Sequence, residues 1–78
     1  MAEENGQWFW NASANPFDKN TPAQWTPYNS SDNDKIEQAF RNKQNKADLS
    51  HHTIHLNDRM QVHKSDFNKQ RPVKREAK

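Results

Sequence analysis

The sequence predicts an α+β fold in which one short helix accompanies about six short antiparallel strands. Two aromatic segments, Trp8–Trp10 and Trp25–Tyr28, are typical of strands in the first third of the chain. A helical spacing of apolar residues follows them, and after residue 46 the apolar residues alternate with polar ones. We find no internal repeat and no domain boundary, so we expect a single domain.

The composition sets limits on the size and stability of this domain. A chain of 78 residues makes at most one small domain with a thin core. Only 29% of its residues are hydrophobic and its mean hydropathy is −1.50, which favours disorder. Three tryptophans, four phenylalanines and one tyrosine argue for folding, because aromatic rings bury a large area per residue. We therefore expect a folded domain of modest stability.

Several protein classes are excluded or disfavoured by the sequence. It contains no cysteine, which excludes disulfides, thiolate metal sites and cysteine nucleophiles. No apolar run approaches the roughly 20 residues of a membrane span. The first residues, Met1–Glu4, carry acids where a signal peptide has a basic start. We expect a soluble protein of the nucleus or the cytoplasm, with no membrane partner.

The first predicted strand contains Trp8, Phe9 and Trp10. In a strand the two tryptophans share one face, so two large rings point into one interior. Trp10 lies beside the polar Asn11, and we expect it at a rim where it can stack on a base or nucleotide.

The second aromatic segment is predicted to be the end or the edge of a strand. Pro27 cannot donate a backbone hydrogen bond, which argues against a central strand. The intervening residues 11–22 are predicted to form an irregular connection. We expect Trp25 to lie in the core, because so small a domain needs its buried area.

A short amphipathic helix is predicted over about residues 31–42. Ile36, Ala39 and Phe40 are spaced as neighbours on one helical face, and Glu37 points away from that face. The residues that could cap its start are Ser30, Ser31, Asp32 and Asn33.

The rest of the chain is predicted to form about four short strands, at residues 47–49, 52–56, 60–63 and 71–75. The polar residues 64–70 are predicted to form a loop. In the last strand, one side carries Arg71, Val73 and Arg75. The core is expected to contain seven large side chains, namely Trp8, Trp25, Ile36, Phe40, Ile54, Leu56 and Val73.

Metal binding and catalysis are poorly supported. Among the four histidines, His52 and His55 face opposite sides of a strand, so ordinary surface or strand histidines are the default interpretation. The chain has no glycine-rich phosphate loop, no nucleophile elbow and no HExxH motif. We therefore expect a binding module and not an enzyme, without a cofactor or a metal.

Charge is distributed unevenly along the chain. Residues 1–34 hold five acids and one base, whereas residues 35–78 hold five acids and eleven bases. Near the C-terminus, Arg71 and Arg75 can offer planar bidentate donors to phosphates. Two other interpretations stay open for this segment: a solvated edge strand, and a weak nuclear-localisation-like string.

Five ordered blocks resemble a WWE domain: Trp8-x-Trp10, Trp25-x-Pro27-Tyr28, Ile36-Glu37-x-Ala39-Phe40, Met60-Gln61 and Arg71-x-Val73-x-Arg75. The resemblance covers about residues 7–75, which leaves residues 1–6 as a flexible N-terminus and 76–78 as a tail. It implies a strongly curved antiparallel sheet, like half a barrel, that cradles the helix. Trp8, Trp25 and Glu37 occupy the positions that name the family, and we expect Glu37 to have a fixed hydrogen-bonding role.

The resemblance also implies a function. Many members bind the ADP-ribose unit of poly(ADP-ribose), often as iso-ADP-ribose, at the open end of the barrel, and they occur beside ubiquitin-ligase or ADP-ribosyltransferase domains. Matched to the family's motif positions, Trp10 is the aromatic residue of the first strand, Gln61 contacts the adenine and Arg71 contacts phosphate. Arg75 adds to the positive electrostatic potential of the site. His52 falls where members usually have a tyrosine. The expected partner is poly(ADP-ribose) or an ADP-ribosylated protein.

Two other functional hypotheses remain open. The histidine at position 52 favours a protein-interaction or structural role without ligand binding, since some WWE domains lack an evident pocket. Single-stranded nucleic acid binding is disfavoured, because the bases cluster at one end of the chain. The order Met60-Gln61, where members usually show Met-x-Gln, implies either a strand irregularity or a register that turns Gln61 to the other face.

Overall fold

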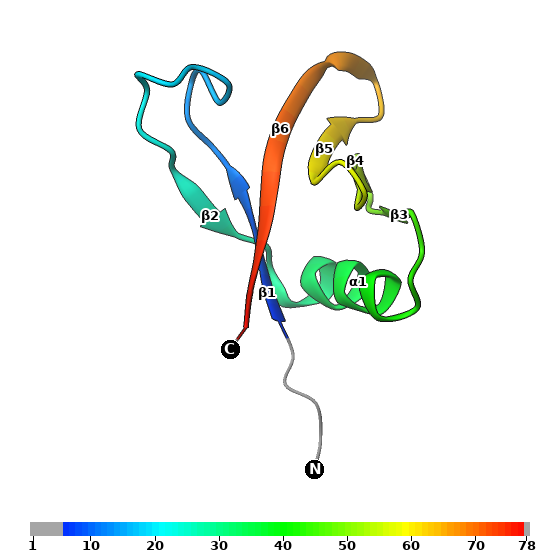
Figure 1. Ribbon diagram of the computed structural model, residues 1–78. Helices are drawn as coiled ribbons and strands as arrows, with labels where there is room; N and C mark the ends of the chain where they lie inside the picture. The colour runs from blue at the N-terminus through cyan, green and yellow to red at the C-terminus, as the bar shows by residue number, and fades with distance from the viewer. Residues whose placement is uncertain (1–5, 78) are drawn as a thin grey trace.

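The structure, a computed structural model, describes residues 6–77 and consists of one antiparallel sheet and one helix (Figure 1). Its elements are β1 (Gly6–Asn11), β2 (Trp25–Pro27), α1 (Ser30–Arg41), β3 (Lys46–Asp48), β4 (His52–His55), β5 (Met60–His63) and β6 (Asp66–Ala77). The strand order is β2-β1-β6-β5-β4-β3, so the six-stranded sheet is open, with β2 and β3 at its edges. The predicted α+β half-barrel is confirmed.

Strand β6 holds the two halves of the sheet together (Figure 1). It has 12 residues, of which residues 73–77 pair with β1, and residues 66 and 70–72 pair with β5. It is longer than predicted: residues 66–70, expected to form a loop, belong to the strand, which returns from β5 through this segment. Gly6 pairs with Ala77 and Gln7 with Glu76, so three residues that we placed in the flanking segments, Gly6, Glu76 and Ala77, belong to the sheet. The rest of the predicted N-terminal segment, residues 1–5, lies outside the described residues.

The strand register determines which side chains face the helix. Trp10 is opposite Val73, Gln61 is opposite Arg71, and Ile54 is opposite Gln61. Cross-strand partners point to the same side of a sheet, so these five side chains all lie on the inner face. Gln61 is therefore turned inward.

Helix α1 covers this inner face. It begins after Asn29, whose Oδ1 accepts a hydrogen bond from the backbone N–H of Asp32 at 2.8 Å. We expected the cap among residues 30–33, and it lies one residue earlier. Ile36 and Ala39 are buried, as their helical spacing predicted, whereas Phe40 is only partly buried and packs edge-on against the ring of Trp8.

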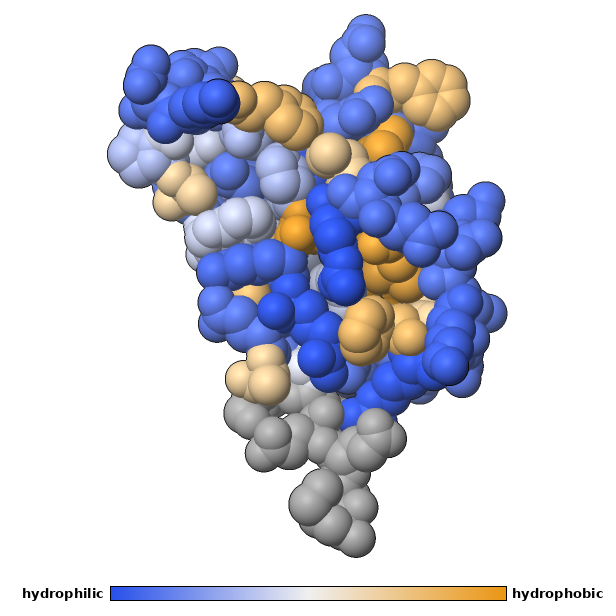
Figure 2. All heavy atoms as spheres, viewed as in Figure 1, coloured by the Kyte–Doolittle hydropathy of each residue, from blue (hydrophilic) through white to orange (hydrophobic). Residues whose placement is uncertain are grey.

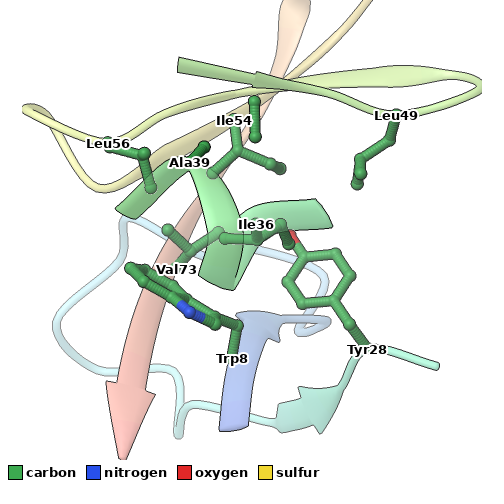
Figure 3. Packing of buried hydrophobic residues seen from close by; sticks show 9 residues of the cluster. Trp8, Tyr28, Ile36, Ala39, Leu49, Ile54, Leu56 and Val73 are labelled. Carbon is green, nitrogen blue, oxygen red and sulfur yellow. The ribbon is translucent and has the colours of Figure 1, made fainter. Parts of the chain in front are cut away.

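The hydrophobic core lies between the helix and the curved sheet. Figure 3 shows Ile36 of α1 next to Trp8, Val73 and Tyr28, with Ile54 on its other side. Among the described residues, the buried cluster consists of Trp8, Tyr28, Ile36, Ala39, Ala47, Leu49, Ile54, Leu56 and Val73. Most of the surface visible in Figure 2 is hydrophilic, in keeping with a thin core.

Trp25 does not belong to this core, contrary to the prediction. Its side chain is on the outer face, 36% exposed, because the pairing of β1 with β2 places Thr26 opposite Trp10 and so turns Thr26 inward. The ammonium group of Lys74 lies 4.9 Å from the centre of its ring. Tyr28, beyond the end of β2, is the residue of this segment that fills the core.

Candidate functional site

Glu37 links helix α1 to strands β1 and β6 through hydrogen bonds of its carboxylate. Its Oε1 accepts hydrogen bonds from Trp8 Nε1 at 2.8 Å and from Arg75 Nε at 3.0 Å. Its Oε2 accepts from Gly6 N at 3.1 Å, Arg75 Nη2 at 2.8 Å and Arg41 Nε at 3.2 Å. The expected fixed role is confirmed, although the side chain is buried instead of facing away from the core.

This network explains the protonation state of Glu37. The hydrogen bonds from Arg75 are the largest influence, and together with those from Trp8 and the Gly6 backbone they lower the pKa of the carboxyl group to about 2, against the opposing effect of burial. Arg75 is therefore committed to a structural ion pair. It is not among the residues around the cavity described next, so we leave it out of the candidate site.

Four of the five residues expected in a ligand site line one cavity of about 540 Å³: Trp10, His52, Gln61 and Arg71. They come from four different strands, β1, β4, β5 and β6. The rest of the lining consists of residues 26–29, Asp32 and Leu49. This size is within the usual range for small-molecule sites, and the lining combines apolar surface with a few polar groups.

A larger cavity, of about 730 Å³, lies between the end of α1 and β3. Its lining includes Lys35, Asn42 and Asp48 but no aromatic residue and no arginine. Such an open, polar surface lacks groups that could enclose a ring or clamp an anion. We therefore take the smaller cavity as the candidate site.

A hydrogen bond inside the cavity wall fixes the orientation of Gln61. The Tyr28 hydroxyl donates to Gln61 Oε1 at 2.5 Å, and both residues are buried. Burial raises the pKa of Tyr28, and the charge of Asp32 raises it further, so the hydroxyl keeps its proton and acts as the donor. Since the amide oxygen is engaged, the Nε2 group of Gln61 is left to donate.

Tyr28 was not predicted to be a site residue. The sequence did carry a signal for its role, because a buried tyrosine hydroxyl usually needs a hydrogen-bond partner.

The guanidinium of Arg71 is held at the cavity wall by the loop that follows β1. Its Nη1 donates to the carbonyl oxygens of Asn11 at 2.9 Å and Ser13 at 2.6 Å, and its central carbon lies 5.7 Å from the centre of the Trp10 ring. Within residues 6–77, no carboxylate pairs with Arg71, and its Nε and Nη2 donate no hydrogen bond. The site therefore offers a positioned positive charge with unused donors.

The loop that holds Arg71 is itself organised by Asn11. The side-chain oxygen of Asn11 accepts hydrogen bonds from the backbone N–H groups of Ser13 at 3.0 Å and Gln24 at 3.1 Å. This buried side chain thus joins the two ends of the irregular connection between β1 and β2. Sequence patterns give no sign of this role, because it depends on contacts across the loop.

His52 is half-buried and contributes a neutral ring to the site. Burial lowers its pKa, and the charges of His63 and His51 lower it further, while Asp32 opposes them. Its ring meets that of His63 edge-on, with 5.0 Å between the ring centres. At neutral pH the ring can therefore stack or donate a hydrogen bond without carrying a charge.

In the part of the chain that the structure describes, no group of three or more histidine, cysteine, aspartate or glutamate residues could hold a metal ion. No helix in residues 6–77 is both long and apolar enough to cross a membrane.

Comparison with protein families shows similarity to the WWE domain. The model of the WWE domain matches residues 6–75, nearly the whole chain, and this range includes every residue of the cavity wall. A comparison with curated proteins finds no match.

Proposed function

The chain belongs to the WWE domain family of binding modules, known for protein interaction or for binding ADP-ribose derivatives, and we propose that it is a non-catalytic reader of ADP-ribose-containing ligands. The ligands that we propose are poly(ADP-ribose) and its iso-ADP-ribose linkage. One observation carries the proposal: Trp10, Gln61 and Arg71 come from three strands and line the same cavity of about 540 Å³. They supply a stacking surface, an oriented amide and a free cationic donor.

Each of these groups matches one part of the ligand. The Trp10 ring, half-buried at the cavity wall, offers a face on which adenine stacks. The Nε2 group of Gln61 donates to a ring nitrogen on the adenine edge. The unused Nε and Nη2 donors of Arg71 hold a phosphate in a charge-assisted pair.

Asp32 makes the distribution of charge in the cavity asymmetric. Among the described residues that line the cavity it carries the one carboxylate, which repels phosphate. It can accept hydrogen bonds from ribose hydroxyl groups or from an exocyclic amine. In the proposed pose the phosphate lies at Arg71, and the sugar or the amino group of the base lies towards Asp32.

Calorimetric titration with iso-ADP-ribose, ADP-ribose and ATP tests the proposal. We expect saturable binding of iso-ADP-ribose or ADP-ribose and weaker binding of ATP. If neither heat nor a chemical-shift change is seen with millimolar iso-ADP-ribose, the proposal is wrong.

The second candidate function, protein interaction, is favoured by the outer face of β1 and β2. The exposed ring of Trp25 and the half-buried ring of Phe9 lie there, with the ammonium group of Lys74 at 4.9 Å and 5.5 Å from their ring centres. Exposed aromatic rings of this kind are enriched at protein interfaces. A Trp25→Ser variant distinguishes the two functions, because it should leave ADP-ribose binding unchanged and weaken binding to a protein partner.

A further inference from the structure

The candidate site, hereafter the first cavity, adjoins a smaller cavity of about 340 Å³, hereafter the second cavity. The residues common to both cavities are His52, Gln61 and Arg71. The lining of the second cavity also includes His63 and Lys69. The two cavities therefore adjoin each other at His52, Gln61 and Arg71.

An irregularity in the sheet forms this second cavity. Val62 of β5 is opposite Gln70, yet the next residue, His63, is opposite Asp66. The β6 segment 67–69 consequently has no partner on β5 and bulges out of the ladder. The bulge is stabilised locally, because the Asp66 side chain accepts from the backbone N–H of Asn68 at 2.9 Å and the Gln70 side chain donates to the Phe67 carbonyl at 2.8 Å. It brings Asn68 and Lys69 to the cavity wall.

The groups around the second cavity suit an anion. Lys69 and Arg71 carry positive charge, and the lining contains no carboxylate, unlike the first cavity with its Asp32. The backbone N–H of Ser65 donates to Nδ1 of His63 at 3.1 Å, which leaves the ring proton on Nε2 as a further donor. The lining has no tryptophan, tyrosine or phenylalanine, so it offers little to a base.

We propose that the second cavity binds a phosphate of a poly(ADP-ribose) chain beyond the unit held in the first cavity. This inference rests on the proposed function, since the two cavities hold parts of the same polymer. Arg71 stands at the shared wall, and Lys69 and His63 receive the next phosphate. The module accordingly selects an oligomer over a single ADP-ribose unit.

The test compares two ligands and two lysine variants. Binding of iso-ADP-ribose and of a defined ADP-ribose trimer is measured by calorimetry for the parent protein, Lys69→Gln and Lys64→Gln. Lys64 is the matched control, because it is an exposed lysine on the same hairpin that lines neither cavity. Both substitutions remove one exposed positive charge, and circular dichroism verifies that each variant folds.

We expect Lys69→Gln to weaken trimer binding about threefold to tenfold, as for loss of one exposed or partly desolvated charged contact. It should leave iso-ADP-ribose binding unchanged, and Lys64→Gln should change neither. A ring-proton shift of His63 that occurs with the trimer and not with iso-ADP-ribose would support the same contact.

The other outcomes overturn the inference in different ways. Equal weakening of both ligands by Lys69→Gln, or no effect on either, rejects the second phosphate site and leaves the proposed function standing. If Lys64→Gln weakens trimer binding as much as Lys69→Gln does, the lysines act through the general electrostatic field of the protein and not through a phosphate site at Lys69. Failure of the parent protein to bind either ligand rejects both the proposed function and this inference.

Discussion

The hydroxyl of Tyr28 donates to the amide oxygen of Gln61 at 2.5 Å, which joins the segment before the helix to the centre of β5. Tyr28→Phe removes this donor and leaves the buried amide free to rotate, at a cost of about 1–3 kcal/mol in the free energy of unfolding. We expect weaker binding of iso-ADP-ribose and a smaller preference for adenine over other bases. Calorimetry with adenine- and guanine-containing ligands measures both effects.

Gln61→Ala is the reference for that experiment. It should reduce the preference for adenine and change the salt dependence of binding little, because the amide is neutral. If Tyr28→Phe keeps the full preference for adenine while Gln61→Ala loses it, the tyrosine does not orient the amide.

Arg71 is expected to supply the main charged contact with the ligand. Hydrogen bonds to charged groups are worth about 1.5–3 kcal/mol each, so Arg71→Ala should weaken ADP-ribose binding about tenfold to a hundredfold. The fold should persist, although the loop loses two hydrogen bonds at Asn11 and Ser13. Titration calorimetry beside a thermal melt separates the two effects, and binding as tight as in the parent would remove Arg71 from the site.

The Glu37–Arg75 pair predicts a dependence of stability on pH. The pKa of Glu37 is lowered from 4.5 to about 2 on folding, so the ionised carboxylate stabilises the fold above the unfolded-state pKa. This contribution, up to about 3 kcal/mol, is lost as the pH falls from about 5 towards 2. Urea unfolding of the parent across this range measures the loss.

Glu37→Gln is the control for that titration. At pH 7 it should be less stable than the parent by about 2–4 kcal/mol, because Arg75 loses its counter-charge. The difference should shrink as the pH approaches 2. A difference that stays constant with pH would mean that the ionised carboxylate is not the source of the stability.

Trp8 and Trp25 should differ sharply in their contributions to stability. Trp8 is fully buried, donates to Glu37 and packs against Phe40, so Trp8→Ala should cost about 3–5 kcal/mol and unfold a marginal domain. Trp25→Ala, on the outer face, should cost about 1 kcal/mol or less. Thermal melts of the two variants make the comparison, and equal losses would contradict the assigned faces.

The sequence by itself determined the helix, the approximate positions of the strands and four of the ten residues that line the cavity. Helical spacing identified Ile36 and Ala39 as buried, and alternation located the strands, because these local periodicities decide which side chains share a face. The ordered motif blocks led to the family that the chain belongs to. They also singled out Trp10, His52, Gln61 and Arg71, which the structure brings around one cavity.

Only the tertiary structure decided which face turns inward and which charges pair. The register of β2 on β1 exposes Trp25 and sends Tyr28 inward to Gln61. Arg75 shares a face with Arg71, yet it lies opposite Trp8 and pairs with Glu37. Spacing along one element cannot encode such partners, because they lie tens of residues away and depend on how strands align and where the bulge in β6 falls.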